Sequence, residues 1–258
     1  MKNFLCGSGW KMYLTCSETV ERLKKLQDNL KGFNDFKVIV FPSFTALADA
    51  NRNLSSTSCV HIGGQDMFWE EEGAFTGEIS AKMLLDVGCE YVEINHQERR
   101  RFLNETDKMA NRKLKYALST PLTPFLCIGE EKKENETEVR AFLKNQINNL
   151  LNGIDKENAK RIVFAYEPMW AIGKYKATDP EYIQTVHKII RNIIAEQYDQ
   201  TLADNAYIIY GGGVNHETFL DLVALPDVNG LFTTGCGIKP DVFADVILRS
   251  AEYLRNHD

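Results

Sequence analysis

Short apolar runs alternate with amphipathic segments along the whole chain. A buried parallel strand reads as a continuous run of about four to six apolar residues, without the alternation of a half-exposed strand. Runs of this kind predict strands at residues 3–9, 37–41, 59–63, 91–94, 123–128, 162–166, 207–210 and 230–233.

The segments between these runs show helical spacing and helix-capping residues. Ser17 is a candidate N-cap, and Val20, Leu23, Leu26 and Leu30 fall on one face of the helix that follows. The predicted helices cover residues 17–31, a segment after Ser43, residues 80–87, a helix capped by Asn104 or Thr106 that reaches Leu118, residues 131–152, residues 180–198 behind Asp179, a short helix from His216 and a final helix from about Pro240.

Eight strand-then-helix units follow one another with no Pro-, Gly- or Ser-rich linker between them. Alternating units of this kind form parallel strands with right-handed crossovers. Eight units in about 250 residues predict an α/β fold with a single closed (β/α)8 barrel domain over residues 1–258. An open doubly wound sheet is the alternative, but the first strand is not followed by GxGxxG.

Net charge and composition exclude some classes of binding partner and site. The net charge is −6, which argues against nucleic acid and anionic membranes as partners. No apolar run approaches the roughly 20 residues that span a bilayer, and the first ten residues do not form a secretory signal. The six cysteines form no CxxC pair, so we expect no zinc site, no disulfide framework and a cytoplasmic location.

Glu167 is the first candidate for chemistry. It follows the apolar run 162–166 and precedes Pro168, which disfavours helix at the residue before it. A carboxylate at this strand end is partly desolvated and hence more basic than a surface carboxylate. Residues 171–177 are small and contain one glycine, a composition typical of a mobile lid. The alternative is an exposed glutamate in a turn.

Other strand ends carry complementary groups. In a barrel these ends become neighbours, which would gather Trp10 and Lys11, His96 with Gln97 and Glu98, Glu167, the glycines 211–213 and residues 234–237. Glycine-rich turns that lead into helices present backbone N–H groups to a phosphate. The sequence shows no cluster of acidic metal ligands, so the residues suit metal-free proton transfer on a phosphorylated substrate. Each of these residues on its own also fits a structural role: Lys11 as a surface cation, His96 as a structural histidine and the glycines as a simple turn.

Seven stretches together resemble the triosephosphate isomerase family over essentially the full chain. They are GWKM (9–12), GAFTGEIS (73–80), HQERR (96–100), CIGE (127–130), AYEPMWAIG (165–173), YGGGVN (210–215) and IKPDVF (238–243). The resemblance implies a cofactor-free aldose–ketose isomerase of glycolysis and gluconeogenesis that interconverts dihydroxyacetone phosphate and glyceraldehyde 3-phosphate.

The resemblance also implies a role for individual residues. Glu167 resembles the base, and His96 the neutral electrophile for which this family is the standard example. Lys11 would balance the negative charge of the substrate, and Glu98 matches a glutamate beside the site. Gly173, Gly213 and Gly235 match the phosphate-binding positions. The resemblance also implies an ion pair between Arg191 and Asp227, and a homodimer formed by the loop from Gly73 to Glu78, with Thr76 at its tip.

The chain departs from the family pattern at several site positions. Gly9 replaces an Asn, Gln97 and Gly213 each replace a Ser, Thr234 replaces a Gly, and the lid is one residue shorter. Gly9 removes a side chain while Thr234 adds a hydroxyl beside the phosphate loop, which would suit a longer sugar phosphate. Two alternatives therefore stay open: isomerisation of a four-carbon ketose phosphate such as L-erythrulose 1-phosphate, and a weakly active protein that binds a phosphorylated ligand.

Overall fold

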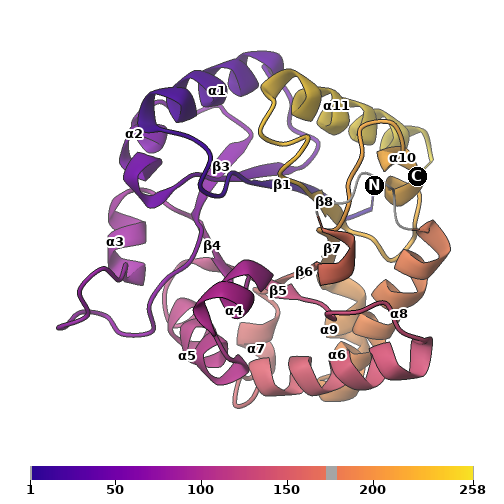
Figure 1. The fold of residues 1–258 in the computed structure, drawn as a ribbon. Helices are drawn as coiled ribbons and strands as arrows, with labels where there is room; N and C mark the ends of the chain where they lie inside the picture. Colours follow the sequence, from indigo (N-terminus) through magenta and orange to yellow (C-terminus); the bar gives the residue numbers. More distant parts are fainter. Residues whose placement is uncertain (1, 173–178, 258) are drawn as a thin grey trace.

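Eight parallel strands close into a barrel with helices around it (Figure 1). The computed structural model describes residues 2–172 and 179–257. The strands are β1 (Leu5–Gly9), β2 (Lys37–Phe41), β3 (Val60–Gly64), β4 (Tyr91–Ile94), β5 (Thr123–Ile128), β6 (Val163–Tyr166), β7 (Tyr207–Tyr210) and β8 (Gly230–Phe232). Pairing of Leu5 with Gly230 and of Gly7 with Phe232 joins β1 to β8, which confirms the (β/α)8 barrel and excludes an open sheet.

The longer helices lie outside the strands, where their apolar faces pack against the barrel. They are α1 (Cys16–Asn29), α5 (Asp107–Leu118), α6 (Glu136–Leu150), α8 (Pro180–Gln197) and α11 (Pro240–Asn256). The short helices are η1 (Phe44–Ala46), α2 (Leu47–Arg52), α3 (Ala81–Asp86), α4 (Gln97–Leu103), α7 (Lys156–Ala159), η2 (Met169–Ala171), α9 (Gln200–Asn205) and α10 (Phe219–Val223).

Capping groups decide where several helices begin. The prediction of Ser17 as the first N-cap is wrong, because Thr15 caps α1 in a capping box with Glu18. The helix predicted from residue 131 begins only at Glu136, because Asn135 forms its capping box with Glu138. Thr106, not Asn104, caps α5, and Asp179 caps α8 as predicted.

The barrel interior is a core of its own. Its members come from alternate positions of the strands: Leu5, Ile39, Phe41, Tyr91, Phe125, Cys127, Val163, Ala165, Ile209 and Phe232. Phe41, Phe125 and Phe232 pack together with ring centroids 4.8–5.8 Å apart. This packed interior closes the middle of the barrel, so side chains at the carboxyl ends of the strands stand on a solid floor.

Candidate functional site

Glu167 follows β6 directly and points into the molecule. Its backbone N–H donates to the Ile128 carbonyl at 2.7 Å, which extends the pairing with β5 by one residue. Only 3% of Glu167 is exposed, so the predicted desolvated carboxylate is confirmed and the alternative of an exposed glutamate is excluded. A Cβ added at Gly211 would lie 2.6 Å from Cγ of Glu167, closer than any real contact. The glycine after β7 is therefore required for this position of the carboxylate.

Burial changes the basicity of Glu167. It raises the pKa of this carboxyl to about 8, against the opposing pull of Lys11. The Oε2 atom is buried and has no hydrogen-bond partner among the described residues. A desolvated carboxylate with a free lone pair is suited to remove a proton from a bound substrate.

His96 caps the N-terminus of α4 with its own side chain. The backbone N–H of Glu98 donates to Nδ1 at 3.2 Å, so Nδ1 is unprotonated and the neutral ring carries its hydrogen on Nε2. Burial and the Lys11 charge lower the pKa of His96 to about 4, which keeps the ring neutral at physiological pH. Its Nε2 lies 3.4 Å from Oε2 of Glu167. The imidazole therefore presents an N–H donor to the same space as the carboxylate.

Lys11 reaches this space from the loop after β1. Its φ of +46° lies in the left-handed region, which is strained for a residue with a side chain. Gln65 holds the turn by donating to the carbonyls of Lys11 and Phe41 at 2.8 and 2.9 Å. The Lys11 ammonium donates to Oε1 of Glu98 at 2.7 Å. Burial opposes the charge on Lys11, but the hydrogen bond to Glu98 and the carboxylates of Glu98, Glu167 and Glu93 together raise its pKa.

The other predicted site residues lie at the same end of the barrel. Oγ1 of Thr234 is 3.8 Å from the position of a Cβ on Gly9, so these two departures from the family pattern are neighbours. The Sγ of Cys236 lies 3.6 Å from the Val214 carbonyl, which joins the turn that contains Gly213 to the turn that contains Gly235. A Cβ at Gly235 would meet no atom within 4 Å. Gly173 and most of the predicted lid lie outside the described residues.

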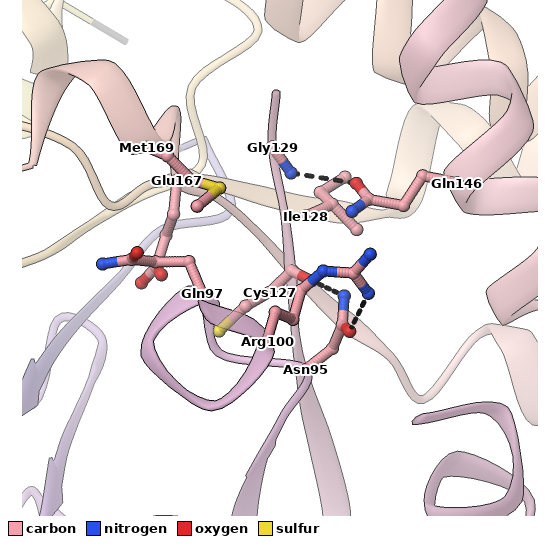
Figure 2. Close-up of a pocket in the computed structure, with 9 residues that line it drawn as sticks. All are labelled: Asn95, Gln97, Arg100, Cys127, Ile128, Gly129, Gln146, Glu167 and Met169. Atoms are coloured by element: carbon pink, nitrogen blue, oxygen red, sulfur yellow. Dashed lines mark hydrogen bonds between the residues drawn. The ribbon is translucent and has the colours of Figure 1, made fainter. Parts of the chain in front are cut away.

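A small pocket lies beside Glu167, on the side of β4 and β5 (Figure 2). The Gln97 amide and the Met169 thioether line it together with the Glu167 carboxylate. No hydrogen bond joins Gln97 to Glu167 within residues 2–172 and 179–257, so Gln97 does not hold the base in this arrangement. Arg100 donates to Asn95 at 2.8 Å and to Asp107 at 2.6 Å, and these contacts fix the start of α4 and hence His96.

Two supporting residues were not predicted from the sequence. Glu130, within CIGE, accepts hydrogen bonds from the Tyr166 hydroxyl at 2.8 Å, the Trp170 indole at 2.7 Å and the Tyr182 hydroxyl at 3.2 Å. It thereby anchors η2, the described segment just before residues 173–178. Gln65 is the second. The predicted ion pair of Arg191 with Asp227 is confirmed at 2.6 Å.

Glu93 is the third residue that sequence reasoning missed. Its carboxylate lies inside the barrel below His96 and Glu167, and the three side chains place one atom each within 4.8 Å of one another. The expectation that no such cluster exists is therefore corrected, because β4 and β6 bring the carboxylates together. The hydrogen on Nε2 of His96 faces this cluster, so the trio does not present the three lone pairs that a metal ion requires.

The connection between β3 and α3 extends away from the barrel (Figure 1). Residues 71–78 within it are exposed. Phe75 in this loop and Met12 and Tyr13 beside Lys11 are large apolar side chains that are 43%, 96% and 66% exposed. Among the described residues, no helix combines the length and the apolar composition that crossing a membrane requires.

The family model and the similar proteins found by comparison point to the same family. Residues 4–250 match the family model described as triosephosphate isomerase. The triosephosphate isomerase of Dictyoglomus turgidum is 40% identical over 96% of this chain and 99% of its own length. Those of Geotalea uraniireducens and Fusobacterium nucleatum are 39% and 37% identical, each over 96% of this chain and 98% of their own.

Proposed function

Because the chain belongs to the triosephosphate isomerase family, we propose that it interconverts dihydroxyacetone phosphate and glyceraldehyde 3-phosphate through an enediolate. The observation that supports this proposal most directly is that two buried groups lie close together at the same end of the barrel. The Glu167 carboxylate accepts protons, the His96 Nε2–H donates a hydrogen bond, and the two atoms are 3.4 Å apart. An aldose–ketose isomerisation needs one group of each kind, on a carbon and on its neighbouring oxygen.

In the forward direction, Glu167 removes a proton from C1 of the ketose and becomes a neutral acid. The C1–H electron pair forms the C1–C2 double bond, and the carbonyl π pair moves to the C2 oxygen, which the Nε2–H of His96 stabilises. A proton then moves from the C1 oxygen to the C2 oxygen through the imidazole. Glu167 returns its proton to C2, which leaves an aldehyde at C1 and restores the carboxylate.

Lys11 supplies the positive charge that this sequence requires. Both the phosphate and the enediolate are anionic, and the Lys11 ammonium is held at the site by Glu98. Oε2 of Glu98 lies 3.6 Å from Nδ1 of His96, but both atoms are acceptors, so the link between the two residues is the backbone N–H of Glu98, which donates to Nδ1. We assign phosphate binding to the backbone N–H groups of Gly173, Gly213 and Gly235, with Gly9 and Thr234 beside them.

The space around Gly9 favours the three-carbon substrate over the four-carbon alternative. A Cβ at this position would lie only 3.1 Å from Cζ of Phe232. The Phe232 ring therefore already occupies part of the room that a glycine at position 9 leaves. The Phe232 ring therefore leaves little extra room beside Gly9 for a longer sugar phosphate.

We further propose that the protein is a homodimer in the cytoplasm. Met12 and Phe75, the latter in the exposed loop from Gly73 to Glu78, are large exposed apolar side chains that a second copy would cover. Met12 directly follows Lys11, so the partner would support the loop that holds the cation. All six cysteines are free thiols, which suits a reducing compartment.

Turnover of two substrates tests the proposal. The protein, produced in a host that lacks its own isomerase, is assayed with dihydroxyacetone phosphate and with L-erythrulose 1-phosphate, and the Glu167→Ala variant serves as the control. We expect fast triose turnover that the variant lacks. Strong turnover of the tetrulose alone would reassign the substrate. Failure on both substrates, with phosphorylated ligands still bound, would establish the binding role instead.

A further inference from the structure

Glu93 is a carboxylate in the barrel interior that the reaction above does not use. It lies on β4, next to Phe125 in the register with β5, and only 5% of it is exposed. One oxygen, Oε1, is 3.8 Å from Nε2 of His96 and 3.8 Å from the Cys127 thiol. Glu93 thus belongs to the layer of barrel side chains next to His96 and Glu167.

No cation neutralises this carboxylate. Within the part of the chain that the structure describes, no lysine or arginine forms an ion pair with Glu93, and the nearby Lys11 is bound to Glu98. An unpaired ionised carboxylate in such a position is very costly, and a buried group of this kind takes up a proton instead. Burial and the neighbouring Glu167 carboxylate raise the pKa of Glu93 well above its usual range.

Four other parts of the barrel end surround the Glu93–Glu167 pair. The titratable and charged groups that act on Glu93 or Glu167 are Lys11 after β1, Asp66 after β3, His96 and Glu98 at the start of α4, and Cys127 on β5. Lys11 is the only cation of this group, and it acts on both carboxyls. The site therefore favours one negative charge on the pair, rather than two.

A protonated Glu93 has an O–H group that needs an acceptor. The buried Oε2 of Glu167 lacks a hydrogen-bond partner, and one oxygen of Glu167 lies within 4.8 Å of an oxygen of Glu93. Nε2 of His96 lies 3.4 Å from this atom, and the Cys127 thiol is a further donor that acts on the Glu167 carboxyl. When a substrate carbonyl takes the Nε2–H of His96, Oε2 of Glu167 loses that neighbour as well.

We propose that Glu93 is a positioning residue for the base: it stays protonated and donates its O–H to Oε2 of Glu167, which leaves Oε1 to take the substrate proton. The inference rests on the proposed role of Glu167 as the base. The two carboxyls have oxygens within 4.8 Å of each other, so the hydrogen bond requires a side-chain rotation that closes this separation. The hydrogen bond stabilises the ionised form of Glu167 and offsets the effect of burial, so that the base is ionised at lower pH.

Two substitutions of similar size separate the explanations. Glu93→Gln keeps a hydrogen-bond donor without a charge, whereas Glu93→Leu keeps the volume without a donor. The measurement is the acid limb of the pH profile of kcat/KM for triose turnover. We expect Glu93→Gln to resemble the wild type, and Glu93→Leu to shift the limb upward by about one pH unit, the scale of a hydrogen bond to a charged group.

Other results would overturn the inference. An ionised Glu93 would repel the charge on Glu167, so both variants would then shift the acid limb to lower pH. If the acid limbs of the wild type and of both variants coincide, Glu93 has a structural role only. If Glu93→Leu does not fold, a Glu93→Gln limb shifted in either direction still contradicts the proposal.

An infrared measurement tests the protonation of Glu93 without turnover. At pH 9.5, above the pKa of Glu167, we expect a carboxylic-acid C=O band in the wild type that persists in Glu167→Gln and disappears in Glu93→Gln. The opposite pattern would place the proton on Glu167 and refute the inference. A wild type that shows this band but no isomerase activity would refute the proposed function alone, so the two failures are distinguishable.

Discussion

Replacing Gly211 by alanine tests whether the position of Glu167 matters for the rate. The added Cβ would lie 2.6 Å from Cγ and 3.0 Å from Oε1 of Glu167. Ordinary contacts between carbon atoms are about 3.5–4.0 Å, so the carboxylate must move by about 1 Å. A misplacement of about 1 Å costs on the order of a hundredfold in rate, or about 2.7 kcal/mol in the activation free energy.

The assay compares kcat and KM of Gly211→Ala with those of the wild type on dihydroxyacetone phosphate. We expect the loss of activity to appear in kcat rather than in KM, because the phosphate-binding turns keep their positions. Gly235→Ala is the matched control: its Cβ meets no atom within 4 Å, so the base stays in place and any effect concerns phosphate binding. A Gly211→Ala variant with wild-type kcat would refute the argument that this approach positions the base.

Three further predictions concern subunit assembly, the hydrogen bonds of Glu130 and the pH dependence of stability. Thr76→Arg places a cation at the tip of the exposed loop; we expect monomers by light scattering and at least a tenfold lower specific activity. Glu130→Leu removes the acceptor of the Tyr166 and Trp170 hydrogen bonds, and we expect urea unfolding to show a loss of about 2–3 kcal/mol. Burial lowers the pKa of His187 to about 3, so the unfolded chain binds a proton below pH 6.5 that the folded chain does not. This histidine should lower folding stability by about 1.4 kcal/mol per pH unit from 6.5 toward 3, and His187→Gln should reduce the total slope, to which His96 also contributes, by that amount.

The barrel was predictable because its strands are buried on both faces. Runs such as Lys37–Phe41, Tyr91–Ile94, Thr123–Ile128 and Tyr207–Tyr210 have in the structure the bounds that the apolar pattern predicts. Short helices were not predictable in the same way. The four residues of α7 and the six residues of α9 are too few to show a helical period, and α4 begins at a histidine cap that resembles a strand end.

The site was predictable where its residues follow strands and was missed where they do not. Lys11, His96 and Glu167 each stand just beyond a strand, and in a barrel this position alone brings them together. Glu93 lies inside a strand, where a carboxylate suggests a face toward solvent. Only the closure of the barrel shows that this face is the interior, and that Glu93 lies beneath the carboxylate of another strand.

Proton exchange with solvent tests the central claim, the transfer of a carbon-bound proton by Glu167. The measurement is NMR of the aldose formed from dihydroxyacetone phosphate in D2O. We predict that deuterium appears at C2, since the proton on the Glu167 carboxyl exchanges before it is returned, and that Glu167→Ala loses both turnover and incorporation. Fast turnover with no deuterium at C2 would indicate a direct hydride shift, and unchanged incorporation in Glu167→Ala would show that another group is the base.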